Sequence, residues 1–310
     1  MKKFFLKIAI FGFVLFALAY VVDMIISTNL QKSKRSDLIS WNNIFSGNMH
    51  HDALILGNSR AMIQFNPLIL DSILNIDSYN LGMASSQILR QIFQYNLYSK
   101  LNEKPKLLIQ SIDFGTMGQR VFEMTGQFLP YFTDKSFKKE IVKWEPFTLM
   151  DRYFPAYRYM GHPTFIVEGL TMNKIAFRTT PLIKGHFPQD LTYDGRELRK
   201  HTVIEFRHDL LALQLFDQHL ANVQKDGIKV VFVYAPVYIG ATEKVDNING
   251  MYQMYDSIAR KYNIPILDYI YDPISYDTTC FYNSTHLNRT GADLFTTKLA
   301  HDIDSLKILK

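Results

Sequence analysis

The chain has 310 residues, of which 47% are hydrophobic and 20% charged, a composition typical of globular proteins that excludes disordered and collagen-like classes. Its formal net charge of +5 lies entirely in residues 1–35, which contain six basic residues and one acidic residue. The remainder carries 28 basic and 28 acidic residues and has no net field to attract a phosphate backbone, so we expect no nucleic-acid partner.

The first predicted element is a membrane-spanning helix. No residue from Ile8 to Val22 is charged, and the apolar run resumes after Asp23, which gives about the length that crosses a bilayer. A cleaved signal peptide is the alternative, because lysines precede the run and Ala17-Leu18-Ala19 matches an A-x-A cleavage pattern. The sequence stays apolar beyond Ala19, which favours an uncleaved anchor. Under both interpretations the globular part is extracytoplasmic if the N-terminus stays inside.

The polar run Ser27–Arg35 predicts a short connector. We therefore divide the chain into an anchor with its connector, residues 1–35, and an α/β domain, residues 36–310. In that domain short apolar strands alternate with helices. The expected strands are Ala53–Leu56, Ser78–Leu81, Lys106–Ile112, Ile228–Tyr234 and Ile264–Asp268, and the expected helices are Pro67–Leu74, a helix capped by Ser85 or Ser86 that reaches Leu101, and helices at about Thr202–Gln224 and Asn249–Lys261.

This alternation predicts a parallel sheet that is covered by helices on both faces and binds its ligands at the carboxyl ends of its strands. Residues 114–200 interrupt the alternation with many aromatic residues, basic residues and prolines. We interpret them as an insertion, either a mostly helical cap packed on the sheet or a lid or partner-binding surface.

Several common site types lack their sequence signal. The chain has no G-x-G-x-x-G, G-x-x-x-x-G-K-[ST], H-E-x-x-H or G-x-S-x-G motif, which leaves dinucleotide, P-loop and zincin sites unsupported. The single cysteine, Cys280, excludes an intramolecular disulfide and is expected to be a packing residue rather than a reactive thiol. His50 and His51 are expected to be solvated residues ahead of a strand rather than metal ligands. We expect no metal and no cofactor.

Three segments at predicted strand ends could carry chemistry. They are Gly57-Asn58-Ser59-Arg60, Asn80-Leu81-Gly82, and Phe281 to Asn288, which contains His286. A serine on the turn that leaves a strand can expose its hydroxyl, and a glycine allows close backbone approach to a bound oxyanion. A late histidine can then act as the base for the serine.

These segments, in this order, resemble the SGNH (GDSL-type) hydrolase superfamily, and more closely its membrane-anchored branches that accompany acyl transfer to surface polysaccharides. The resemblance covers about residues 50–115 and 225–303. It implies a flavodoxin-like three-layer α/β/α fold with a parallel sheet. It also implies that Ser59 is the nucleophile, Gly82 an oxyanion glycine and His286 the base.

Two positions depart from the family pattern. Asp113 stands where the family has an asparagine after the third strand, and a carboxylate is a poor oxyanion donor unless it is protonated. Asn283 stands where the family has an aspartate three residues before the histidine, so it can orient the imidazole but supplies no negative charge. Nearby carboxylates could supply that charge, and the candidates are Asp268, Asp272 and Asp277. Arg60 is expected to form a structural ion pair or to bind an acidic substrate.

The sequence therefore predicts an extracytoplasmic, membrane-anchored serine esterase or O-acyltransferase. Its substrate would be an ester, in particular an acetyl ester of a cell-envelope glycan, and a membrane acyltransferase is a conceivable partner. An SGNH-fold binding or assembly protein without catalysis is the alternative from another class, favoured by Asn283 and Asp113. A generic lipid esterase is a third hypothesis, kept open by the anchor.

Overall fold

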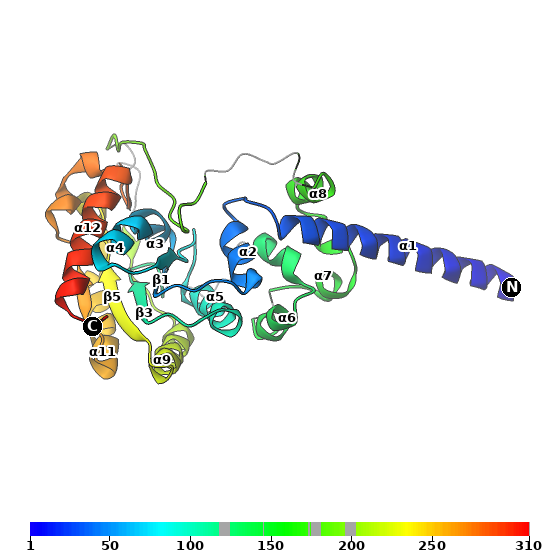
Figure 1. Ribbon diagram of the computed structural model, residues 1–310, viewed down its shortest axis with the longest axis horizontal. Coiled ribbons are helices and arrows are strands. Elements are labelled where there is room, and N and C mark those ends of the chain that lie inside the picture. Colours follow the sequence, from blue (N-terminus) through cyan, green and yellow to red (C-terminus); the bar gives the residue numbers. More distant parts are fainter. Residues whose placement is uncertain (118–124, 145, 173, 175–180, 196–202, 310) are drawn as a thin grey trace. The chain divides into compact units, whose positions relative to one another are not determined.

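The computed structural model describes residues 1–117, 125–144, 146–172, 174, 181–195 and 203–309 (Figure 1). The chain divides into two compact units. The first contains Met1–Gly47 and Met124–Pro181, and the second contains Asn48–Glu123 and Leu182–Lys310. The middle of the sequence thus groups with the N-terminal segment, so this division differs from the expected one at residue 35, in which residues 114–200 are an insertion of the α/β domain.

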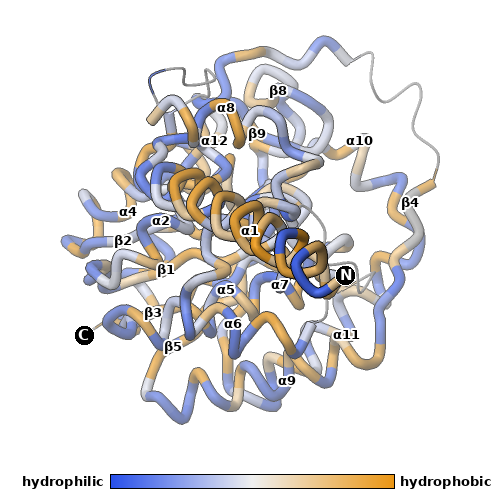
Figure 2. Tube along the Cα trace, turned by 90° about the vertical axis from the view of Figure 1, so that its right-hand side faces the viewer, coloured by the Kyte–Doolittle hydropathy of each residue, from blue (hydrophilic) through white to orange (hydrophobic). Residues whose placement is uncertain are grey.

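The first unit is helical. Its long helix α1 (Lys2–Leu30) has mean hydropathy 2.5 over its most apolar window, and Figure 2 shows it as predominantly hydrophobic. One helix of the described residues is therefore long and apolar enough to cross a membrane. The other elements are α2 (Ile39–Ser46), η1 (Thr125–Tyr131), α6 (Lys135–Ile141), α7 (Leu149–Tyr153), η2 (Tyr157–Tyr159) and α8 (Pro163–Leu170).

The last turns of α1 belong to the core of the first unit. Residues 27–30, expected to begin a connector, continue the helix, and Ile26 and Leu30 are buried. The buried carboxylate of Asp23 accepts a hydrogen bond at 2.5 Å from Arg158 and another at 2.9 Å from the backbone N–H of Ala156. Because an unpaired buried charge is strongly unfavourable, this pairing explains how an aspartate can stand in an apolar helix.

The second unit contains a parallel sheet of five strands in the order β2-β1-β3-β5-β7. This is the flavodoxin-like order, in which the first strand in the chain lies between the second and third. The strands are β1 (Ala53–Leu56), β2 (Ser78–Asn80), β3 (Leu107–Ser111), β5 (Lys229–Tyr234) and β7 (Ile266–Asp268). The α/β fold class predicted from the sequence is confirmed.

Helices cover both faces of this sheet, as Figure 1 shows. Alternate side chains of β5 point to opposite faces, so Val231 and Val233 join the core under α12, whereas Phe232 packs against Phe216 and Tyr255. The covering helices are α3 (Ser59–Gln64), α4 (Pro67–Leu74), α5 (Ile88–Leu101), α9 (Leu210–Lys225), α11 (Ile248–Tyr262) and α12 (Arg289–Ser305). The shorter elements are α10 (Ile239–Thr242), η4 (Pro273–Tyr276), η5 (Thr278–Cys280), β4 (Ile204–Glu205), β6 (Val245–Asp246), β8 (Phe281–Asn283) and β9 (His286–Leu287).

One predicted helix cap was wrong, and one predicted helix begins later in the chain than expected. Helix α5 has Gln87 as its N-cap, without a side-chain cap, and Ser85 lies before it with a positive φ of 53°. Helix α9 begins only at Leu210, because the carboxylate of Asp209 accepts the backbone N–H of Ala212 and ends the preceding loop. The predicted start near Thr202 lies outside the described residues.

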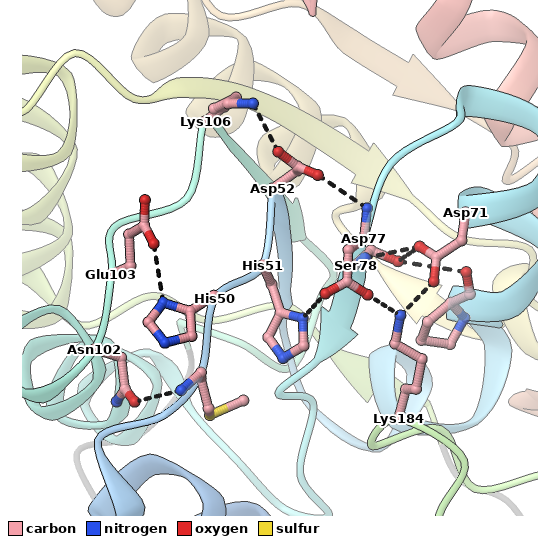
Figure 3. Close-up of polar contacts among 12 residues, drawn as sticks. His50, His51, Asp52, Asp71, Asp77, Ser78, Asn102, Glu103, Lys106 and Lys184 are labelled. Carbon is pink, nitrogen blue, oxygen red and sulfur yellow. Dashed lines mark hydrogen bonds and ion pairs between the residues drawn. The ribbon is translucent and has the colours of Figure 1, made fainter.

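A cluster of charged side chains lies at the amino ends of the strands (Figure 3). Asp52 precedes β1 and binds Lys106 at 2.8 Å, and the bonds from Lys106 and from the Asp77 backbone lower the pKa of Asp52. Lys184 contacts both Asp71 and Asp77, and Asp77 also contacts His51 at 2.7 Å. This cluster ties the segment around Lys184 to the edge strand β2.

Burial of two histidines makes the second unit sensitive to acid. His219 on α9 lies 5.0 Å from the Tyr95 ring, and burial lowers its pKa to about 4. His186 is also buried, which lowers its pKa to about 4. The unfolded chain takes up these protons near the ordinary histidine pKa of about 6.5, whereas the folded chain does not.

We therefore expect the free energy of unfolding to fall as pH drops from 6.5 to 4, by up to about 1.4 kcal/mol per pH unit for each buried histidine. Urea unfolding at several pH values measures this slope. His219→Phe should make it shallower, while the same change at the exposed His301 should leave it unaltered. An identical slope in wild type and His219→Phe would contradict the role of His219.

Candidate active site

The first site segment leaves the carboxyl end of β1 in a tight turn. The side-chain oxygen of Asn58 accepts the backbone N–H of Arg60 at 2.9 Å, which caps α3 and makes Ser59 its first residue. Gly57 is required sterically, because a Cβ there would lie 2.5 Å from the Cβ of Ala61 and 2.8 Å from that of Ser111. Strand packing therefore fixes the place of Ser59, which is partly exposed.

His286 reaches this turn from the C-terminal part of the chain. It begins β9, which pairs antiparallel with β8 and packs on α3. Its Nε2 lies 2.8 Å from Ser59 Oγ, and its Nδ1 lies 3.0 Å from the side-chain oxygen of Asn283. Three residues that the sequence analysis selected from the order of the motifs thus form a continuous hydrogen-bonded chain.

The hairpin around Asn283 holds the imidazole in place. The Asn283 side-chain oxygen accepts the backbone N–H groups of Thr285 and His286, each at 3.0 Å. The Thr285 hydroxyl lies 3.0 Å from His286 Nδ1, and the Tyr282 ring stacks on the imidazole with centroids 5.5 Å apart. These contacts limit rotation of the ring.

Gly82 lies buried in the turn after β2. Its N–H donates to the Asn80 side-chain oxygen at 2.8 Å, and a Cβ at this position would lie 2.4 Å from the backbone nitrogen of Met62. The close approach that Gly82 permits is therefore to α3. Its predicted part in binding an oxyanion would require the bond to Asn80 to open. By contrast, the N–H of Ser59 has no acceptor among the described residues.

Asp113 and Arg60 form a buried ion pair next to Ser59. The Arg60 guanidinium lies 3.3 Å from the Asp113 carboxylate and 4.2 Å from the centre of the Phe114 ring. The carboxylate also accepts the Asn58 side-chain amide and, at 2.6 Å, the N–H of Gly115. Asp113 thus acts as an acceptor in these contacts, and Arg60 forms one of the two interactions that the sequence analysis expected, a structural ion pair.

The three alternative carboxylates bind other groups. Asp268 accepts the backbone N–H of Ile270, Asp272 binds Lys298, and Asp277 accepts both the N–H and the hydroxyl of Thr279. The contacts of these three carboxylates are therefore with the backbone, Thr279 and Lys298.

The other candidate residues have structural surroundings. His50 and His51 pair with Glu103 and Asp77 at the opposite end of the sheet, and no cluster of three potential metal ligands occurs among the described residues (Figure 3). Cys280 is buried in the core, where burial raises the pKa of its thiol. The sequence analysis assigned no role to Asn58, although an asparagine between a strand and a helix is a recognisable N-cap signal.

No family model and no curated protein sequence matches the chain. Among solved structures, it is similar to one described as a platelet activating factor from Streptococcus pneumoniae, with 12% identity, coverage of 95% of this chain and 99% of that chain, and a TM-score of 0.43. It is also similar to a protein described as lipolytic and of the G-D-S-L family from Desulfitobacterium hafniense, with 11% identity, 81% and 98% coverage, and a TM-score of 0.42. An acetyl xylan esterase shares 10% identity, with 82% and 98% coverage and a TM-score of 0.39.

The buried pair beside Ser59 should contribute strongly to stability. Asp113→Ala leaves the Arg60 guanidinium buried without its carboxylate, and loss of one partner of such a pair costs about 3–5 kcal/mol. Urea unfolding of the single variants and of Asp113→Ala combined with Arg60→Met measures the coupling. The double variant should be less destabilised than the sum of its parts. Additive losses would show that the two side chains do not interact.

Proposed function

We propose that the chain is a membrane-anchored, extracytoplasmic serine esterase or O-acyltransferase. It would act on ester groups, in particular acetyl esters of a cell-envelope glycan, through an acyl intermediate on Ser59. The observation that carries this proposal is the 2.8 Å contact between Ser59 Oγ and His286 Nε2, with Asn283 behind the ring.

This geometry supports nucleophilic catalysis. With Nδ1–H donating to Asn283, Nε2 is the unprotonated nitrogen and accepts the Ser59 hydroxyl proton. Ser59 Oγ attacks the carbonyl carbon of the ester, and the imidazolium returns the proton to the departing alcohol. Water or a sugar hydroxyl then attacks the acyl-serine, His286 takes its proton, and Ser59 is regenerated by receiving that proton.

The negative charge that develops on the carbonyl oxygen needs donors. The Ser59 N–H is unoccupied within the described residues and lies at the start of α3, beside the attacking hydroxyl. Gly82 would be a second donor if its N–H left Asn80. Asp113 would not itself donate to the oxyanion. Its carboxylate would instead hold the side chains of Asn58 and Arg60 in place beside Ser59.

Membrane attachment is assigned to α1. Its apolar surface is exposed from Phe4 to Ile25, as expected for a helix surrounded by lipid. We place the rest of the chain outside the cytoplasm, with the glycan acceptor and any membrane acyltransferase partner on that side. These finer assignments follow the resemblance of the three motifs.

A silent binding or assembly protein is the second candidate. Asn283 supplies no negative charge to the imidazolium, and Asp113 presents a carboxylate where the resembling family has an amide. The two substitutions could leave a folded site without turnover.

Ser59→Ala separates a covalent enzyme from a binding protein. We expect the wild type to react with a fluorophosphonate probe and to hydrolyse p-nitrophenyl acetate, and Ser59→Ala to lose both, because the covalent route is gone. Ser99→Ala is the control, since that hydroxyl donates to the backbone carbonyl of Asn96 in its own helix, α5. Equal labelling of wild type and Ser59→Ala would falsify the assignment of Ser59 as the nucleophile.

Asn283→Asp tests the charge behind the imidazole. An aspartate should raise the imidazole pKa, move the rising limb of the pH–rate profile to higher pH, and increase the maximal esterase rate. In serine proteases the reverse change lowers kcat about 10⁴-fold, which is an upper guide. Asn75→Asp adds the same charge beside Asp52 and Lys106, at the other end of the sheet, and should change neither rate nor profile. A folded Asn283→Asp protein without turnover would favour the binding protein.

A further inference from the structure

The first unit exposes apolar side chains that its own packing does not use. Five of them, which we call the collar, belong to two short segments of the chain. The first segment contains Tyr153, Phe154 and Tyr157, and the second contains Leu170 and Met172. Their exposed fractions range from 41% at Tyr157 to 70% at Tyr153. Exposed apolar side chains gathered in this way are typical of surfaces that contact a membrane or another protein.

Contacts with α1 fix the height of the first segment along the helix. The N–H of Ala156 and the guanidinium of Arg158 both bind Asp23, and the Tyr159 hydroxyl lies 2.7 Å from that of Ser27. The collar residues Tyr153 to Tyr157 therefore lie next to the turn of α1 that contains Asp23.

Helix α8 brings the second segment to the same height. Phe165 packs under the Arg35 guanidinium, and the carbonyl of Gly169 accepts the Asn29 side chain at 2.7 Å. A Cβ on Gly169 would lie 2.8 Å from the Cα of Ile26, so α8 runs antiparallel to α1. Leu170 and Met172, which follow, reach the level of Ile26 or beyond, toward the N-terminus of α1.

This height coincides with the end of the apolar span. A helix rises about 1.5 Å per residue, so Phe4 to Val22 covers about 28 Å, close to the hydrocarbon thickness of about 30 Å. This span includes one charged residue, Lys7, which lies one turn from its N-terminal end, where a long side chain can extend to the headgroups. Asp23 is then the first polar residue beyond the hydrocarbon, and its buried pairing with Arg158 keeps the charge from facing lipid. Lys32 and Lys34 follow as exposed cations on the same side.

We propose that the collar lies in the headgroup region of the bilayer and holds the first unit against the membrane surface around α1. The proposal rests on the membrane anchoring proposed above. Tyrosine and phenylalanine suit this boundary, because each ring is apolar and the tyrosine hydroxyl can reach water. The lysines beyond the helix suit anionic headgroups.

Lipid-borne quenchers test this placement in the full-length chain. Single cysteines that carry an environment-sensitive fluorophore are introduced as Tyr157→Cys, Met172→Cys, Val14→Cys and Lys139→Cys, each with Cys280→Ser. Each protein is reconstituted in phosphatidylcholine vesicles that contain a nitroxide lipid labelled either near the headgroup or near the end of the acyl chain. Only variants that melt at the wild-type temperature are compared.

We expect the headgroup-proximal nitroxide to quench the labels at Tyr157 and Met172. Lys139 is the matched control, an exposed position of the same unit on α6, and its label should keep its fluorescence. Labels at Tyr157 and Met172 that behave like the Lys139 label would overturn the proposal and leave the collar to a protein partner. Val14 reports the anchor separately, because its label should respond to the deep nitroxide; if it does not, the anchoring itself fails.

Discussion

The close approach of backbone segments at the carboxyl ends of β1, β2 and β3 is the constraint on which the candidate site depends. A Cβ at position 57 would clash with the side chains of Ala61 and Ser111, and a Cβ at position 82 would clash with the backbone of Met62, so both positions require glycine. The first turn of α3 is thereby pressed between the ends of neighbouring strands. The position of Ser59 follows from this packing, and the hairpin that carries His286 completes the arrangement because it packs on the same short helix.

The polar groups around Ser59 combine rigidity with an unusual distribution of charge. The side-chain amide of Asn58 donates a hydrogen bond to the Asp113 carboxylate, and the Arg60 guanidinium forms an ion pair with the same carboxylate. Behind His286 the opposite holds, since a neutral amide occupies the orienting position. On the serine side of the site, the Asp113 carboxylate and the Arg60 guanidinium thus form an ion pair. All of these residues belong to the second unit, so the first unit contributes no side chain to the hydrogen-bonded chain itself.

The sequence predicted best where the signal was local. Pro67 marked the start of α4, and the apolar runs marked all five sheet strands to within two residues. The order of motifs indicated that Ser59 and His286 would meet. Long-range partners had no such signal. In the sequence Asp23 only interrupts an apolar helix, and its pairing with Arg158, 135 residues away, could not be predicted. The sequence also contained no sign that the carboxylates near His286 would bind Lys298 and local backbone N–H groups.

The continuity of α1 into the core of the first unit bears on how the chain could be processed. Cleavage after Ala19 would remove most of the exposed apolar surface of α1, and the new N-terminus would be Tyr20. The buried face of α1, which consists of Asp23, Ile26, Ser27 and Leu30, would remain on the mature chain. The apolar span of α1 and its buried face are therefore separate parts of the helix. If α1 is the anchor proposed above, a peptidase acting at that site would convert an anchored form into a diffusible one and leave the buried face of α1 in its helical unit.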